Sequence, residues 1–130
     1  MRKPILMMLL AVVSSGAVAE WVNVGESDAQ TATVYVDADT IRKVGNKVKM
    51  SILFDLKTAE ASFGSPYMSI TRQAEFDCKE AQVRTLSVSF HSGKMGGGKV
   101  VSSTSAPGDW LPALSGSVVE KVWRIACGKP

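Results

Sequence analysis

The sequence contains 130 residues, of which 45% are hydrophobic and 21% are charged, with 15 Lys and Arg residues against 12 Asp and Glu residues. This composition excludes an intrinsically disordered chain and a collagen-like repeat, and two cysteines are too few for a disulfide-dense mini-protein. The length is typical of one domain.

Residues 1–19 have the features of a secretory signal peptide. Arg2 and Lys3 give a positive start, Ile5–Val13 is an apolar run, and Ala17–Ala19 is a small-residue cleavage site. The run holds about nine residues, whereas a membrane-spanning helix needs roughly 20. We therefore predict that this segment guides export and is then removed, and that the protein has no membrane span.

Removal of the signal peptide changes the charge of the protein. The basic count falls from 15 to 13 against 12 acidic residues, which gives a net charge of +1 over residues 20–130. A near-neutral domain lacks the basic footprint of nucleic-acid binding, so no nucleic-acid partner is predicted. No cysteine lies at the cleavage site to carry a lipid. We predict a single exported domain, periplasmic or secreted, with no lipid anchor.

Cys78 and Cys127 are the two cysteines of the chain, and both follow the cleavage site. An even pair in an exported protein is most simply one disulfide, which here closes a loop of about 50 residues. A metal site or a redox pair is the alternative, but the sequence lacks CxxC spacing and a neighbouring histidine. We predict a structural disulfide, no metal and no cofactor.

Beyond the signal peptide, apolar and polar residues alternate in segments separated by turn-forming residues, as in a β-sheet. The first two predicted strands are residues 20–24 and 31–37, and Asp37–Thr40 predicts a turn because Asp side chains bind backbone amides two residues on. Gly45-Asn46 predicts a hairpin into the clearest alternating strand, residues 47–56. One face of that strand is apolar and carries Val48, Met50, Ile52, Phe54 and Leu56.

Two further strands are predicted at residues 67–78 and 82–91, after a polar loop at residues 57–66. The connection between these two strands is short, so we expect them to be antiparallel neighbours. Residues 99–104 form the last predicted strand, and residues 105–115 form a loop that contains two prolines.

The end of the chain changes to a helical period. Ser117 and Glu120 fit a capping box, in which the N-cap serine and the glutamate each bind a backbone amide at the helix start. Gly128 and Pro130 give a stop signal. A helix of about ten residues is unstable alone, so it must pack on the sheet. We predict an α+β fold: an antiparallel sheet of about six strands, one C-terminal helix packed on one face, and one disulfide.

A glycine-rich segment, Gly93–Lys99, has the G-x-x-x-x-G-K spacing of a phosphate-binding loop. Val100 follows where that motif has Ser or Thr, and the next residues predict a strand where the motif opens a helix, so nucleotide binding is not expected. A flexible hairpin tip is the better interpretation. The predicted partner-binding residues in this loop are Gly96, Gly97, Gly98 and Lys99.

His91 is the single histidine of the chain, and its predicted role is structural. A catalytic triad would need residues such as Ser92 or Asp109 beside the His91 ring, and no spacing in the sequence places them there. Asp37 and Asp39 lack the pattern of a calcium-binding loop. We therefore predict that the protein is not an enzyme.

Serine and threonine residues recur on one face of the predicted sheet: Ser69, Thr71, Thr85, Ser87 and Ser89. One solvated face is normal in antiparallel sheets, so simple solvation is the first interpretation, and a partner-binding surface is the second. A free outer strand also offers pairing with a second copy of the chain, which gives a route to a homodimer.

The sequence resembles the surface-adhesin protein E family of Gram-negative bacteria over nearly all of residues 20–130. Short segments in a shared order carry the resemblance, together with the two cysteines. They are Trp21, Tyr35-Val36-Asp37, Thr40-Ile41, Val48-Lys49-Met50, Leu53, Asp55, Glu75-Phe76-Asp77-Cys78, His91-Ser92, Met95-Gly96, Val100-Val101, Trp110, Gly116-Ser117, Glu120, Trp123 and Cys127.

The resemblance implies a six-stranded antiparallel sheet with a packed helix and a disulfide, in agreement with the prediction from the residues. It also implies adhesion, since the family's namesake binds host extracellular-matrix and serum proteins such as vitronectin and laminin and can dimerise. We expect an exported, non-enzymatic binding domain with a protein partner. The alternative is a periplasmic envelope protein that binds a bacterial partner or a small ligand, because the namesake is a lipoprotein and this chain lacks the lipobox cysteine.

Overall fold

The computed structural model describes residues 20–61 and 64–130, so the predicted signal peptide lies outside the described residues. The elements in chain order are β1 (Val22–Glu26), β2 (Ala32–Val44), β3 (Lys47–Glu60), β4 (Tyr67–Asp77), β5 (Gln82–His91), the 3-10 helix η1 (Lys94–Gly96), β6 (Val100–Thr104), β7 (Leu111–Pro112) and α2 (Val118–Ala126).

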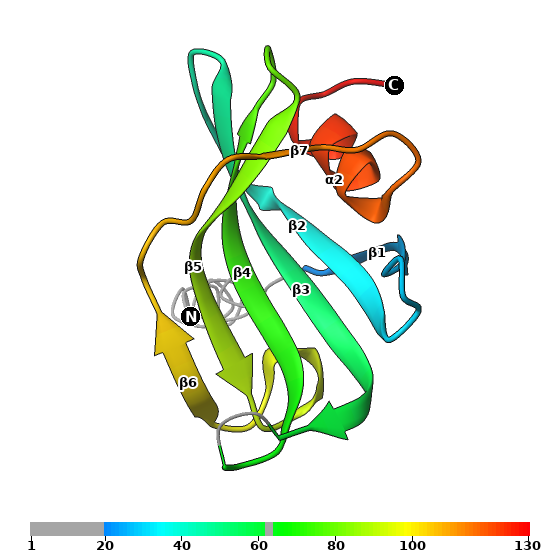
Figure 1. The fold of residues 1–130 in the computed structure, drawn as a ribbon, viewed down its shortest axis with the longest axis vertical. Coiled ribbons are helices and arrows are strands. Elements are labelled where there is room, and N and C mark those ends of the chain that lie inside the picture. Colours follow the sequence, from blue (N-terminus) through cyan, green and yellow to red (C-terminus); the bar gives the residue numbers. More distant parts are fainter. Residues whose placement is uncertain (1–19, 62–63) are drawn as a thin grey trace, which may run out of the picture.

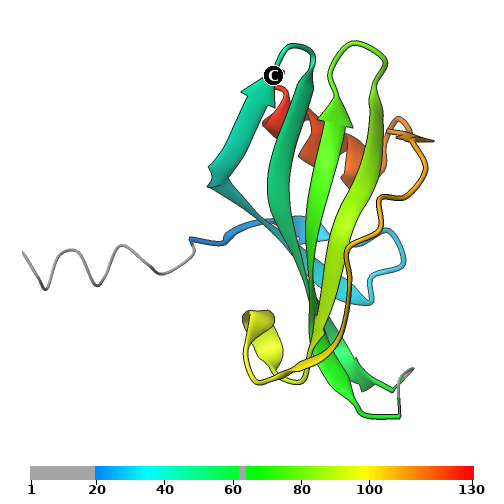
Figure 2. The same cartoon turned by 90° about the vertical axis from the view of Figure 1, so that its left-hand side faces the viewer.

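The strands β1 to β6 form one antiparallel sheet in which each strand pairs with the next, and the two-residue strand β7 pairs with β5. The helix α2 lies on one face of this sheet, and η1 lies on the opposite face (Figures 1 and 2). The predicted α+β fold, with about six antiparallel strands and one C-terminal helix, is confirmed. Each connection is a hairpin or a short loop, which follows from the turn residues between the alternating segments.

The main core lies between α2 and the end of the sheet where β3 begins and β4 ends. Val48 and Met50 of β3 and Phe76 of β4 are buried there against Val122 and Ala126 of the helix. The alternation seen in the sequence thus places one side of β3 under the apolar stripe of α2. At the other end of the same face a second cluster forms around Ala32, Leu56 and Tyr67.

The helix begins and ends as the sequence predicts. Ser117 is the N-cap, and its hydroxyl accepts a hydrogen bond from the Glu120 N–H at 3.2 Å. The Glu120 carboxylate accepts from the Gly116 N–H at 2.9 Å, one residue before the position that a capping box would use. Both bonds satisfy backbone amides that have no partner inside the helix.

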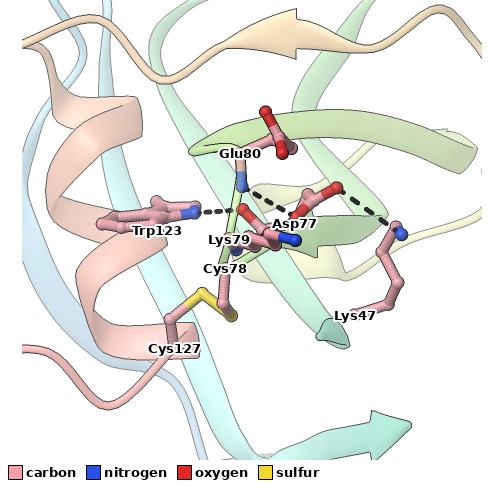
Figure 3. Close-up of a disulfide and its surroundings, with 7 residues drawn as sticks. All are labelled: Lys47, Asp77, Cys78, Lys79, Glu80, Trp123 and Cys127. Carbon is pink, nitrogen blue, oxygen red and sulfur yellow. Dashed lines mark hydrogen bonds and ion pairs between the residues drawn. A yellow bond between two sulfur atoms is a disulfide. The ribbon is translucent and has the colours of Figure 1, made fainter. Parts of the chain in front are cut away.

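A disulfide between Cys78 and Cys127 joins the end of β4 to the end of α2, as predicted (Figure 3). The two Cα atoms are 5.6 Å apart. Next to the bond, the Trp123 indole N–H donates to the Asp77 carbonyl at 2.9 Å, so helix and strand are joined twice within a few residues (Figure 3). These contacts fix where the short helix sits on the sheet.

The predicted turn at Asp37–Thr40 is wrong, because β2 continues through it with a bulge. The pairing with β3 shifts between Asp37 and Arg42. Asp37 accepts from the Asp39 N–H at 3.1 Å, which is the bond expected of a turn. The Thr40 hydroxyl, however, donates to the Asp37 carbonyl at 2.6 Å and accepts from the Ser51 N–H at 2.9 Å. The threonine thereby bridges the bulge to β3, so the strand does not end there.

Removing the disulfide is expected to lower the free energy of unfolding by about 4 kcal/mol, because the bond spans 49 residues and limits the unfolded chain. The double variant Cys78→Ala with Cys127→Ala avoids a free thiol, and urea unfolding at pH 7 measures the change. A double variant as stable as the wild type would contradict this account.

Protonation of Asp77 is expected to weaken the same corner of the fold (Figure 3). The Glu80 N–H, then the Lys79 N–H and Lys47, hold the pKa of Asp77 below its usual value. Since the unfolded pKa is about 3.9, the stabilisation is present above that pH and is lost as the pH falls through the lower folded pKa.

The stability difference between wild type and Asp77→Asn should therefore be clear at pH 7 and shrink at pH 2 to 3. Urea unfolding at both pH values measures this, with the exposed Asp109→Asn as a matched control. A difference that is the same at both pH values would show that the Asp77 charge is not involved.

Candidate functional site on the open face

The face of the sheet opposite α2 is called here the open face (Figure 2). It carries a groove of about 320 Å³. Central strands β3, β4 and β5 form its floor, and a tryptophan that precedes β1 borders it. Its lining residues are Trp21, Ser51, Thr71, Arg72, Gln73, Ser87 and Ser89. We call it the open-face groove.

Strand register places the polar side chains of the groove side by side. Ser51 lies opposite Gln73, and Gln73 lies opposite Ser87, while Thr71 lies opposite Ser89. The Gln73 amide donates to the Ser51 hydroxyl at 2.8 Å. The predicted polar face therefore exists across three strands, with Gln73 exposed to solvent at its centre.

Thr85 is not part of this face, which corrects the prediction that grouped it with Ser87. A bulge in β5 shifts the pairing, so that Gln73 lies opposite Ser87 but Ala74 lies opposite Thr85. The extra residue at Leu86 reverses the alternation. Thr85 therefore faces the side of the sheet where α2 packs.

His91 lies beside the open-face groove, where its Nε2 and the Thr71 hydroxyl are 2.7 Å apart. Burial lowers the pKa of His91 below its usual value, which favours the neutral ring at pH 7. The Ser92 hydroxyl accepts from the Lys99 N–H at 3.0 Å, and Asp109 lines a cavity on the opposite side of the sheet. The structure thus does not bring these three residues together as a triad.

The segment Gly93–Lys99, called here the glycine loop, folds back onto the open face and includes η1 (Figure 2). The buried Ser69 hydroxyl donates to the Gly93 carbonyl at 2.6 Å and accepts from the Gly96 N–H at 2.8 Å. Asp55 accepts from the Met95 N–H at 2.8 Å. The loop is therefore attached to β3 and β4 and does not extend from the sheet as a free hairpin tip.

The glycines of this loop meet backbone requirements. Gly98 has φ +70°, and a Cβ atom there would lie 2.2 Å from the Ser92 hydroxyl oxygen. Gly96 has φ +75° and lies against the Thr71 side chain. Gly97 donates its N–H to a carbonyl within the loop, and Lys99 is exposed. A direct role of these residues in binding stays a prediction.

A cluster of charged and aromatic side chains continues the open face toward the β5 edge. Arg84 forms an ion pair with Glu75 at 2.7 Å, and its guanidinium carbon lies 4.7 Å from the centre of the Trp110 ring. Lys47 approaches the same ring at 5.8 Å. No local pattern in the sequence indicates this cluster, because only the β5 bulge and the pairing of β7 with β5 bring Trp110 beside Arg84.

On the other side of the sheet, a cavity of about 270 Å³ lies between the sheet, α2 and the segment 108–112. We call it the helix-side cavity. Most of its lining is apolar, but it includes Arg72. Burial lowers the pKa of Arg72 below its ordinary value, although an arginine guanidinium stays protonated in proteins.

The sequence matches the family model of Surface-adhesin protein E over residues 21–128, and the chain belongs to this family. No curated protein matches it. Within the described residues, no helix has the length and hydrophobicity that a membrane span requires, and no group of three or more His, Cys, Asp or Glu side chains is placed to hold a metal ion.

The fold is similar to solved structures of Haemophilus influenzae protein E. Crystal form II of that protein has a TM-score of 0.65 at 13% identity, with 82% of this chain and 90% of that chain covered. Protein E from non-typeable Haemophilus influenzae has a TM-score of 0.64 at 11% identity, with 83% of this chain and 75% of that chain covered. These likenesses support the sheet-and-helix architecture over most of the domain.

Replacing Ser69 by Ala should loosen the glycine loop. It leaves the Gly93 carbonyl and the Gly96 N–H without their partner in a buried position, which costs about 1–3 kcal/mol. Urea unfolding measures the loss of stability, and hydrogen exchange at Gly96 should become faster. The exposed Ser105→Ala is the matched control, and an unchanged exchange rate in Ser69→Ala would contradict the anchoring role.

Proposed function

We propose that the protein is an exported, non-enzymatic binding domain of the adhesin type and that its open face is the partner-binding surface. The single observation that carries this proposal is the open-face groove, which lies on the side of the sheet that α2 does not cover. Membership of the Surface-adhesin protein E family supports both the export and the binding role.

The chemistry of the open face supports a protein partner. The groove floor offers hydroxyl and amide groups at its surface, and Trp21 borders it. At the other end, Trp110 lies under Arg84. Tryptophan and arginine are the residues that contribute most binding free energy at protein interfaces, while polar groups around them provide hydrogen bonds.

The proposed partner class is a host extracellular-matrix or serum protein, with vitronectin and laminin as the first candidates. Membership of the Surface-adhesin protein E family supports this partner class, because the family's namesake is an adhesin. The glycine loop is proposed to contribute through Lys99, which is exposed at the end of the loop. Polar side chains of the groove would bind the partner, and the two tryptophans would anchor it at either end.

An arginine introduced into the groove should block binding. Wild-type protein without residues 1–19 is expected to bind immobilised vitronectin or laminin saturably at micromolar concentration in biolayer interferometry. Ser87→Arg places a long charged side chain over the groove floor and should weaken binding at least tenfold. Lys99→Ala, which tests the loop, should weaken it severalfold.

Ser105→Arg is the matched control, because it adds the same side chain at an exposed position outside the groove, and its affinity should stay within twofold. Absence of saturable binding to both proteins would overturn the host-adhesion form of the proposal. Equal weakening in Ser87→Arg and Ser105→Arg would remove the open face as the binding surface.

A further inference from the structure

The helix-side cavity is built from three elements that face each other. Ile52, Ala74 and Phe76 of the sheet form its floor, Val119 of α2 forms one wall, and Leu111 of the segment 108–112 forms another. Its volume of about 270 Å³ lies just below the range of drug-sized ligand sites, which is about 300–1,000 Å³. The walls therefore suit a compact, largely apolar body.

Arg72 introduces a positive charge into this apolar lining. Arg72 borders both the cavity and the open-face groove, but it lies opposite Ile52 of β3, whose side chain belongs to the core under α2, so the alternation of β4 places Arg72 on the helix side. There its guanidinium carbon lies 4.8 Å from the centre of the Phe54 ring. The contact with Phe54 and the position of Arg72 in the cavity lining both place its side chain on the helix side of the sheet.

The Arg72 guanidinium has no partner of opposite charge among residues 20–61 and 64–130. Its Nε atom is fully buried, and no atom of the described residues accepts a hydrogen bond from the Nε–H. The second arginine of the cavity lining, Arg84, is already paired with Glu75 at 2.7 Å, and Asp109, the acidic lining residue, is exposed. A partly buried guanidinium whose Nε–H has no acceptor is unfavourable, and the contact with Phe54 offsets only part of that cost.

We propose that the helix-side cavity binds a small carboxylate with an aliphatic body, whose carboxylate pairs with Arg72 and whose apolar part lies against Ile52 and Val119. A carboxylate accepts two parallel hydrogen bonds from a guanidinium, so it supplies the partner that residues 20–61 and 64–130 do not. The aliphatic body replaces water along the apolar walls. Arg72 borders both this cavity and the open-face groove, but binding of a small carboxylate in the cavity is measured without the protein partner, so the proposal does not depend on the proposed adhesion.

Octanoate and octanol are the probes, because they share an aliphatic chain and differ in charge. Isothermal titration calorimetry with the protein lacking residues 1–19 should show saturable binding of octanoate at one site, with octanol at least tenfold weaker. Arg72→Gln should weaken octanoate at least tenfold and leave octanol within twofold. Arg84→Gln, the matched control, should keep octanoate binding within threefold, because Glu75 already holds that guanidinium.

Val119→Phe gives a second test that keeps Arg72 in place. The larger side chain fills part of the cavity from α2 and should weaken octanoate and octanol together. Circular dichroism and thermal unfolding check that each variant is folded. The proposal is overturned if octanoate does not bind the wild type, if Arg72→Gln binds it normally, or if Arg72→Gln and Arg84→Gln weaken it equally.

Discussion

The rest of the structure depends on how one short helix covers one face of a long sheet. The helix α2 has nine residues and spans about 14 Å, whereas β3 has 14 residues and spans about 46 Å. The helix can therefore bury only one end of the apolar face, and the Cys78–Cys127 bond with the Trp123 contact holds it there. The apolar residues at the far end form their own cluster.

This partial cover divides the molecule into surfaces with different chemistry. At the N-terminal part of α2, the sheet, the helix and the segment 108–112 do not fill the space between them, and the helix-side cavity results. On the other face the described residues place only the short 3-10 helix η1, and the glycine loop that contains it covers the end near Ser69 and Asp55 (Figure 2). The polar centre of that face stays accessible, so a partner surface and a small-molecule cavity can lie on opposite faces of one small domain, with Arg72 bordering both.

Much of the fold was predictable because it follows from local rules. The alternation in β3, the Gly45-Asn46 hairpin and the Ser117 cap each depend on residues close in the sequence, and the disulfide follows from two cysteines in an exported chain. The turn at Asp37–Thr40 failed because Thr40 also bonds to Ser51 on the neighbouring strand. The same local bonds serve a turn or a bulge, and only the partner strand distinguishes them.

The sequence by itself determined the fold class, the family resemblance, the strand and helix segments, and a sheet with one polar face. Tertiary structure alone decided which side chains share that face, because one extra residue in β5 moves Thr85 to the helix side and leaves Arg84 beside Trp110. It also decided that the glycine loop lies against Ser69, and that Arg72 borders an apolar cavity where the described residues offer its Nε–H no acceptor. Strand register and side-chain pairing are long-range properties, so spacing along the chain does not specify them.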